Sequence, residues 1–316
     1  MNNVKTDHCL LSDIDFDDRT FPFSYGFLPA RLESSIAAVG LLQQPLLLVS
    51  DNGFKIVCGR RRLEVISKTA DGSGKISVCL AENSSFQELF RRALWENLAI
   101  REFNPVETAD IYTAAAKLFS IDEIEKEIMP ALKLPLKPRF RMRCQVIAGF
   151  SRKLRDLLAA GSVDVETVDL IKGWSDKERT ALTDLVEETG LRRNKLREVV
   201  SRLDDLACRD EVSPLEPLFA ARKAVLNEAG GIDVELLRSH LKARLYPQLT
   251  AAHLEFAALQ EKFSWPADLR LEPPPDFEGG EYRLSFTFTG SDEWRKICDK
   301  LASVALEDVD ELCRRP

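Results

Sequence analysis

The sequence has no long hydrophobic run, no C-x-x-C pair and only three histidines. Its longest apolar stretches, Ile36–Leu42 and Pro45–Val49, are far shorter than the ~20 residues that cross a bilayer. The seven cysteines are scattered without metal-ligand spacing, which favours reduced thiols over a zinc site. The first residues are polar and acidic, unlike a signal peptide. We therefore expect a cytoplasmic protein that does not enter a membrane.

The charge balance excludes a uniformly basic protein. The 316 residues include 44 Lys and Arg against 51 Asp and Glu, which gives a formal net charge of −7. At roughly 150 residues per domain, this length predicts two or three domains. Because nucleic-acid binding depends on neutralising phosphates with Lys and Arg, any such contact must come from a local basic patch.

One segment has the required charge. No acidic residue lies between Glu127 and Asp156, a segment that holds eight Lys and Arg residues. A basic patch in a helical region is typical of a helix-turn-helix DNA reader, and a solvated helix face is the alternative. As phosphate contacts, these side chains would support binding to all DNA sequences alike. The candidate DNA-binding residues are Lys137, Arg139, Arg141, Arg143, Arg152 and Lys153.

The first 103 residues predict a compact α/β domain. Apolar residues at helical spacing predict helices over 31–42, 60–70 and 85–98. Short apolar runs at 45–49, 54–57 and 76–80 predict strands, the first two joined by an Asn-Gly turn. Ser85 and Glu88 form a capping box for the third helix.

The rest of the chain predicts a helical domain over 104–212 and a small α/β module over 213–316. Asn104-Pro105-Val106-Glu107 combines an N-cap with a proline at N1, so a helix begins there. The prolines of Leu132–Pro138 interrupt helicity. In the last module, Pro214–Pro217 is interpreted as a linker, Tyr282–Thr289 as a strand, and Ser291 as the cap of a final helix. The expected fold class is α+β.

Two short clusters predict phosphate chemistry. The first, Gly59-Arg60-Arg61-Arg62, follows a predicted strand and opens a helix, where free N–H groups and planar arginine donors suit an anion. The second is Glu96-Asn97, whose carboxylate and amide oxygens suit Mg²⁺ beside a phosphate. The alternative interpretations are that the first is a basic cluster on the surface and that the second is an ordinary helix end.

These motifs occur in an order that resembles the ParB family of centromere-binding and partition proteins. The family pattern runs roughly G-E-R-R-x-x-A, E-N-x-x-R and N-P-x-E, followed by a helix-turn-helix. Here the matching residues are Gly59–Leu63, Glu96–Leu98 and Asn104–Glu107, and Leu154–Val163 resembles the segment that follows. The resemblance covers roughly residues 28–190 and implies a ParB/sulfiredoxin-like amino-terminal domain followed by a divergent helix-turn-helix region.

The resemblance also implies a function. ParB proteins bind specific DNA, and many bind and slowly hydrolyse CTP, which closes a dimer into a sliding clamp. Carried over by position, Gly59, Arg61 and Arg62, with Arg60 in the same cluster, would contact the triphosphate. Glu96 and Asn97 would lie beside Mg²⁺. The implied protein is a nucleoid-associated homodimer, dimerised through residues 213–316, with DNA and a partition-type ATPase as partners and at most a slow CTPase activity.

The sequence also departs from the family pattern. Arg60 stands where the family has glutamate, and Ile100 stands where it has arginine, with Arg101 following. The segment Gly40–Pro45 also has one residue more before its proline than the family pattern, which has a glutamine-proline pair there. Two other functions are therefore considered: an adaptor with a decayed nucleotide pocket, and a small-molecule phosphotransferase or nucleotidase on the same fold.

Overall fold

The computed structural model describes residues 4–26, 30–69, 74–226, 230–262, 269–279 and 281–313. The chain divides into two units, residues 1–200 and 201–316, and each is described by itself. The structure combines helices with a mixed sheet, which confirms the α+β class. Among the described residues, no helix is both long and apolar enough to span a membrane. The division into domains 1–103, 104–212 and 213–316 stays a prediction.

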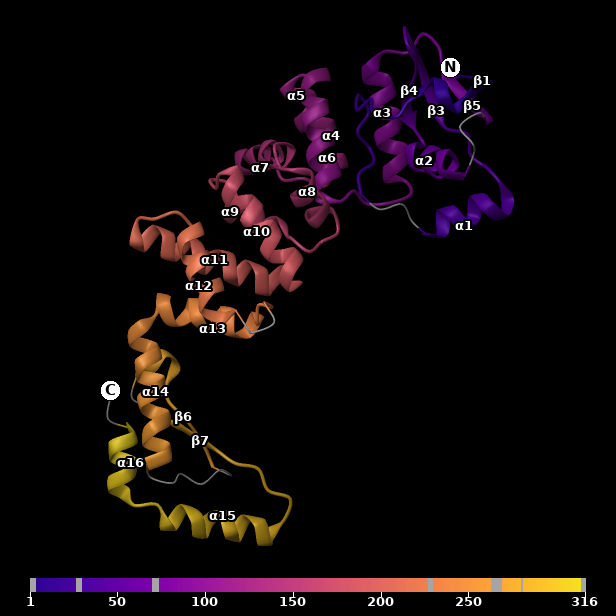
Figure 1. Cartoon of the computed structure of the whole chain (residues 1–316). Coiled ribbons are helices and arrows are strands. Elements are labelled where there is room, and N and C mark those ends of the chain that lie inside the picture. Colours follow the sequence, from indigo (N-terminus) through magenta and orange to yellow (C-terminus); the bar gives the residue numbers. More distant parts are fainter. Residues whose placement is uncertain are drawn as a thin grey trace. The chain divides into compact units, whose positions relative to one another are not determined.

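A five-stranded mixed sheet forms the amino-terminal part of the first unit (Figure 1). Its strands lie in the order β1-β5-β3-β4-β2. Antiparallel pairs join β1 to β5 and β3 to β4, whereas β3 with β5 and β2 with β4 are parallel. The strands are β1 (Val4–Leu10), β2 (Ile14–Asp15), β3 (Leu46–Ser50), β4 (Gly53–Cys58) and β5 (Lys75–Ala81), and a short 3-10 turn (Leu11–Asp13) separates β1 from β2.

The predicted hairpin between β3 and β4 is confirmed, and its turn depends on glycine. Gly53 has a φ of +122°, and a Cβ placed there would lie 2.2 Å from the carbonyl oxygen of Asp13. Only glycine therefore lets β4 pass this close to the segment that leads into β2. The hairpin places Cys58 at the end of β4, directly before the glycine-arginine cluster.

Three helices accompany the sheet: α1 (Ala30–Val39), α2 (Arg60–Thr69) and α3 (Phe86–Leu98). Leu63 of α2 is fully buried in a core cluster with Leu47 and Ile56 of the hairpin strands, so α2 packs on the sheet. Helix α3 begins at the predicted Ser85 capping box and buries one apolar face, which includes Phe90. The predicted helices are confirmed, but the first ends at Val39 and not at residue 42, because Gly40 has a left-handed backbone. Ala70 lies outside the described residues.

The rest of the first unit is helical, as expected. Its elements are α4 (Pro105–Leu118), α5 (Ile121–Glu123), a π-helical turn (Ile124–Ile128), α6 (Met129–Ala131), α7 (Pro138–Ala148), α8 (Arg152–Ala159), α9 (Val165–Ile171), α10 (Asp176–Thr189) and α11 (Arg193–Asp210), which continues into the second unit. Residues 121–131 form one continuous helical segment, and the proline-containing turn 132–137 separates it from α7. Asn104 caps α4, as predicted, and also forms a capping box with Glu107.

The second unit contains mainly helices and a two-stranded antiparallel sheet. Its elements are α12 (Leu215–Val225), α13 (Val234–Leu245), α14 (Pro247–Lys262), β6 (Arg270–Glu272), a 3-10 turn (Pro275–Phe277), β7 (Arg283–Ser285), α15 (Ser291–Ser303) and α16 (Leu306–Cys313). The Pro214–Pro217 linker was a wrong prediction, because α12 begins at Leu215 and tolerates proline in its first turn. The predicted strand shortens to β7, and Gly290 rather than Ser291 precedes α15 as its N-cap.

Candidate functional site: a glycine-arginine cavity

The turn between β4 and α2 brings the chain backbone close to Pro45. Gly59 has a φ of +88°, and a Cβ at this position would lie 3.0 Å from the Cβ of Pro45 and 3.1 Å from its Cα. Glycine therefore meets two demands here, a left-handed backbone and a close approach. The consequence is that α2 starts directly at the mouth of a cavity, with its arginines in the first turn.

Replacing Gly59 by alanine is expected to lower the free energy of unfolding by about 1–3 kcal/mol, because the left-handed backbone is strained for any other residue. Thermal denaturation of the full chain measures this loss. Gly173→Ala is the matched control, since nothing lies within 4 Å of its added Cβ. Equal melting temperatures for the two variants would contradict the assignment of strain to Gly59.

All six candidate nucleotide-binding residues line one cavity of about 220 Å³. They come from two places far apart in the sequence, the start of α2 and the end of α3. Apolar side chains such as Phe21 and Phe23 complete the wall. The residues brought together are Gly59, Arg60, Arg61, Arg62, Glu96 and Asn97.

Arg62 and Glu96 form an ion pair in the lining of the cavity. A nitrogen of the Arg62 guanidinium lies 3.2 Å from Oε1 of Glu96, and another donates to the carbonyl oxygen of Gln43 at 2.9 Å. The amide of Gln43 also donates to Oε1 of Glu96, at 3.3 Å. Both hydrogen bonds to Glu96 therefore end at the same oxygen, and Arg62 already holds an anionic group.

Arg61 contacts a second carboxylate, that of Glu107, which is fully buried. The Arg61 guanidinium donates to Oε1 of Glu107 at 2.9 Å and to the hydroxyl of Ser24 at 3.0 Å. Arg101 donates to the other oxygen of Glu107 at 2.7 Å, and the backbone N–H groups of Tyr25 and Asn104 complete the set. Glu107 thus joins the cavity to the first turn of α4.

Arg60 turns toward a different part of the chain. Its guanidinium donates to the carbonyl oxygens of Phe16 at 2.7 Å and Asp18 at 2.5 Å, and only 6% of the residue is exposed. Burial lowers the pKa of Arg60 to about 10, which leaves it charged at neutral pH. Because its donors serve this loop, Arg60 anchors the segment beside β2 as well as lining the cavity.

Glu96 and Asn97 suit magnesium only in the presence of a phosphate ligand. The amide nitrogen of Asn97 donates to the carbonyl oxygen of Ala93 at 2.9 Å, so its Oδ1 is the atom available to a cation. No group of three or more His, Cys, Asp or Glu side chains among the described residues could hold a metal. Mg²⁺ commonly takes one or two protein ligands and completes its shell with phosphates and water, which these two residues match.

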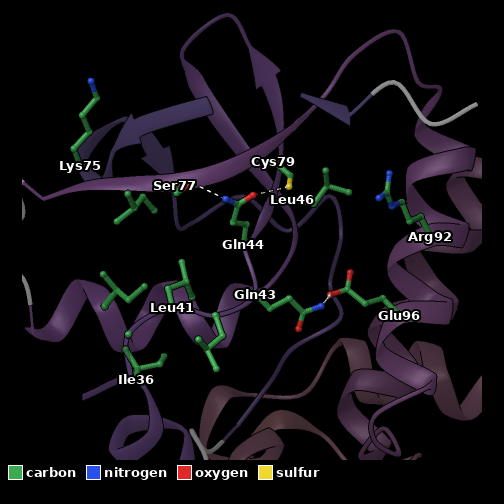
Figure 2. Close-up of a pocket in the computed structure, with 14 residues that line it drawn as sticks. Ile36, Leu41, Gln43, Gln44, Leu46, Lys75, Ser77, Cys79, Arg92 and Glu96 are labelled. Atoms are coloured by element: carbon green, nitrogen blue, oxygen red, sulfur yellow. Dashed lines mark hydrogen bonds between the residues drawn. The ribbon is translucent and has the colours of Figure 1, made fainter. Parts of the chain in front are cut away.

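A larger cavity, of about 870 Å³, adjoins the first and shares Gln43 and Glu96 with it (Figure 2). Figure 2 shows the Gln44 amide between two partners: it donates to the hydroxyl of Ser77 at 2.6 Å and accepts from the thiol of Cys79 at 3.2 Å. No sequence motif predicted these residues as part of the site, although the two glutamines before Pro45 were a signal.

Cys58 sits at the cavity without the properties of a reactive thiol. It is 3% exposed, and burial together with the nearby Glu96 carboxylate raises the pKa of its thiol well above the usual value. A neutral, buried thiol is a poor nucleophile. The cavity therefore favours binding over thiol chemistry.

The structure distributes the candidate DNA-binding residues unevenly. Four of the six form ion pairs with acidic residues of other elements, since the basic segment itself contains no acidic residue. The pairs are Arg139 and Arg143 with Asp169, Arg141 with Glu125, and Lys153 with Asp184 and Glu187. Among the described residues, Lys137 and Arg152 are exposed and make no ion pair. The local positive charge is therefore smaller than the sequence suggests.

Asp169 on α9 is held as an anion by its two arginines. Burial alone would raise the pKa of Asp169, but hydrogen bonds from Arg143 and Arg139 outweigh it and lower the pKa below the usual range. The same contact raises the pKa of Arg143. The ion pair is therefore fully formed at neutral pH and joins α7 to α9.

Comparison with known proteins gives one informative sequence relative. No protein-family model matches the chain. Over 156 residues it is 24% identical to the probable chromosome-partitioning protein ParB of Campylobacter jejuni, a match that covers 49% of this chain. The chain is therefore similar to a ParB protein over about half of its own length. The chain spans about half (54%) of the length of this ParB relative.

Two solved structures of C-terminally truncated ParB from Caulobacter crescentus are also similar. One is complexed with CTP-gamma-S and has a TM-score of 0.26 with 16% identity, covering 58% of this chain and 99% of that one. The other is complexed to the centromeric parS site and has a TM-score of 0.31 with 16% identity, covering 62% and 98%. The ParB-like motifs of this chain, from Gly59 to Glu107, all lie in the first unit.

Proposed function

We propose that this chain is a ParB-like DNA-binding partition protein whose glycine-arginine cavity binds CTP and thereby regulates the helical DNA-binding part. One observation carries the proposal. Arg61 lines the cavity and, through the buried carboxylate of Glu107, contacts the first turn of α4. A ligand that competes for Arg61 would therefore act directly on the start of the helical part.

The cavity has the chemistry that a triphosphate requires. The first turn of α2 supplies backbone N–H groups and positive potential at the cavity. Arg61 and Arg62 already bind carboxylates, Glu107 and Glu96. Phosphate oxygens suit the same planar donors and would replace these carboxylates. The adjoining larger cavity gives room for a sugar and a base, and the resemblance to the ParB family specifies CTP.

Magnesium would bind together with the nucleotide. When a phosphate takes over Arg62, the carboxylate of Glu96 is released to face a cation, with the Asn97 amide oxygen beside it. Mg²⁺ bound there would neutralise phosphate charge. The chain's own residues would position the phosphates and would exclude water from the contacts between arginine and phosphate.

DNA would contact the first turn of α7. The continuous helical segment 121–131, the turn 132–137 and α7 form two helices joined by a turn, and α7 is the second of them. In helix-turn-helix proteins the amino-terminal residues of the second helix contact base edges. Here these positions carry Lys137 and Arg139, of which Arg139 has a 71% exposed side chain.

Lys137→Ala is expected to weaken binding to duplexes of any sequence. Because Lys137 would neutralise one phosphate, the slope of log affinity against log salt should fall by about 0.9. Fluorescence anisotropy of a labelled duplex over a salt series measures both quantities. Lys5→Ala, in β1, is the control and should leave the slope unchanged. Identical slopes for wild type and Lys137→Ala would remove this lysine from the interface.

The same titration with and without CTP tests the regulatory part of the proposal. We expect CTP with Mg²⁺ to change the affinity or the lifetime of the DNA complex. DNA binding that ignores CTP would leave the adaptor with a decayed pocket as the better function. The homodimer, the partition-type ATPase partner and the nucleoid-associated cytoplasmic location stay predictions from the resemblance.

A further inference from the structure

One carboxylate, that of Asp169 on α9, receives hydrogen bonds from two arginines of α7. Arg143 donates from Nε at 3.0 Å and from Nη2 at 2.5 Å, and Arg139 donates from Nη2 at 2.6 Å. Only 19% of the Asp169 side chain is exposed. The three groups together carry a net charge of +1, and they lie where the first turn of α7 meets α9.

The two arginines use this carboxylate in different ways. Arg143 pairs with both oxygens of Asp169 and has a 17% exposed side chain, so its fork of donors is consumed within the protein. Arg139 uses a single nitrogen, and its side chain is 71% exposed. Asp169 therefore fixes the direction of the Arg139 guanidinium while most of its five donors stay open to a ligand.

This arrangement reduces the advantage that an anionic ligand would have over a neutral one at Arg139. The negative charge of Asp169, 2.6 Å from Arg139, offsets the attraction that a phosphate would feel there. The edge of a guanine offers two neutral acceptors, O6 and N7, spaced for two parallel arginine donors. A guanidinium that is already oriented loses less freedom when it binds such an edge.

We propose that Arg139 reads a guanine in the major groove and that Asp169 is the positioning residue that orients it. The inference rests on the proposed DNA-binding function and specifies which residue of α7 discriminates between bases. It separates Arg139 from Lys137, which lacks a carboxylate partner among the described residues and contacts phosphate.

The test is selection from a fully randomised duplex library with the full-length wild type, Arg139→Ala, Asp169→Asn and Lys137→Ala. The wild type should enrich a motif with a preferred G·C pair. Arg139→Ala should abolish the preference at that pair, from roughly 10–100-fold to near unity. Asp169→Asn should weaken the preference at the same pair and leave the rest of the motif intact. Lys137→Ala should enrich the wild-type motif with lower affinity.

Other outcomes overturn the inference in distinguishable ways. An unchanged motif in Asp169→Asn, with higher affinity for all duplexes, would make Asp169 only a neutralising partner. An unchanged motif in Arg139→Ala, with uniformly lower affinity, would make Arg139 a phosphate contact. Failure of the wild type to bind any duplex would instead overturn the proposed DNA-binding function itself. A folding defect lowers binding to all duplexes alike, so it cannot imitate a loss at a single base pair.

Discussion

Replacing Glu107 by alanine is expected to lower the free energy of unfolding of the helical part by about 3–5 kcal/mol. The carboxylate is fully buried and accepts hydrogen bonds from Arg61, Arg101, and the backbone N–H groups of Tyr25 and Asn104. Its removal leaves two guanidinium groups without their shared anion and two N–H donors without an acceptor.

Hydrogen–deuterium exchange of peptides from α4, followed over a urea series, measures this loss locally in the full chain. Glu102→Ala is the matched control, because Glu102 has a 91% exposed side chain and its ion pair with Lys133, at 3.6 Å, is open to solvent. It should change the same free energy by less than about 0.5 kcal/mol. If the α4 amides are protected from exchange equally in Glu107→Ala and in Glu102→Ala, then Glu107 does not join the cavity to the helical part.

Arg62→Ala is expected to weaken CTP binding by roughly tenfold to a hundredfold, the value of one or two hydrogen bonds to a charged group. Arg62 is a better test than Arg61, because loss of Arg61 also removes one of the two guanidinium groups that hold the buried Glu107 carboxylate. The partner of Arg62 is Glu96, whose side chain is 26% exposed and tolerates solvent. Isothermal titration with CTP and Mg²⁺ gives the affinity directly.

Arg91→Ala is the control for this measurement. Arg91 belongs to α3, as Glu96 does, but it pairs with Glu127 and Glu123 away from the cavity. CTP affinity in Arg91→Ala should stay within about twofold of wild type, which is the change expected without a phosphate contact. Equal losses in Arg91→Ala and Arg62→Ala would mean that general charge, and no specific contact, governs nucleotide binding.

Local elements of this fold were predictable because their causes lie within a few residues. The Ser85 and Asn104 capping boxes each depend on one side chain and the residue three positions later. The β3–β4 hairpin depends on Asn52-Gly53 between two apolar runs. The candidate nucleotide residues meet at one cavity because β4 is followed at once by α2, and α3 returns beside β4.

The features that were missed depend on partners far away in the sequence. Strand β1 has a polar sequence and forms only because β5 offers it a pairing edge. Glu107 was visible as a capping residue, but its bonds to Arg61 and Arg101 bring together three separate segments. The basic segment showed no acids of its own, and Asp169 became its partner only when α9 packed against α7.

The most direct test of the account is equilibrium binding of labelled CTP to the full chain, with ATP and GTP as competitors and with or without Mg²⁺. The account predicts saturable CTP binding that is strengthened by Mg²⁺ and resists displacement by ATP or GTP. No binding to any of the three nucleotides would contradict it. The glycine-arginine cavity would then be a structural junction, with Arg61 and Arg62 serving only their carboxylate partners.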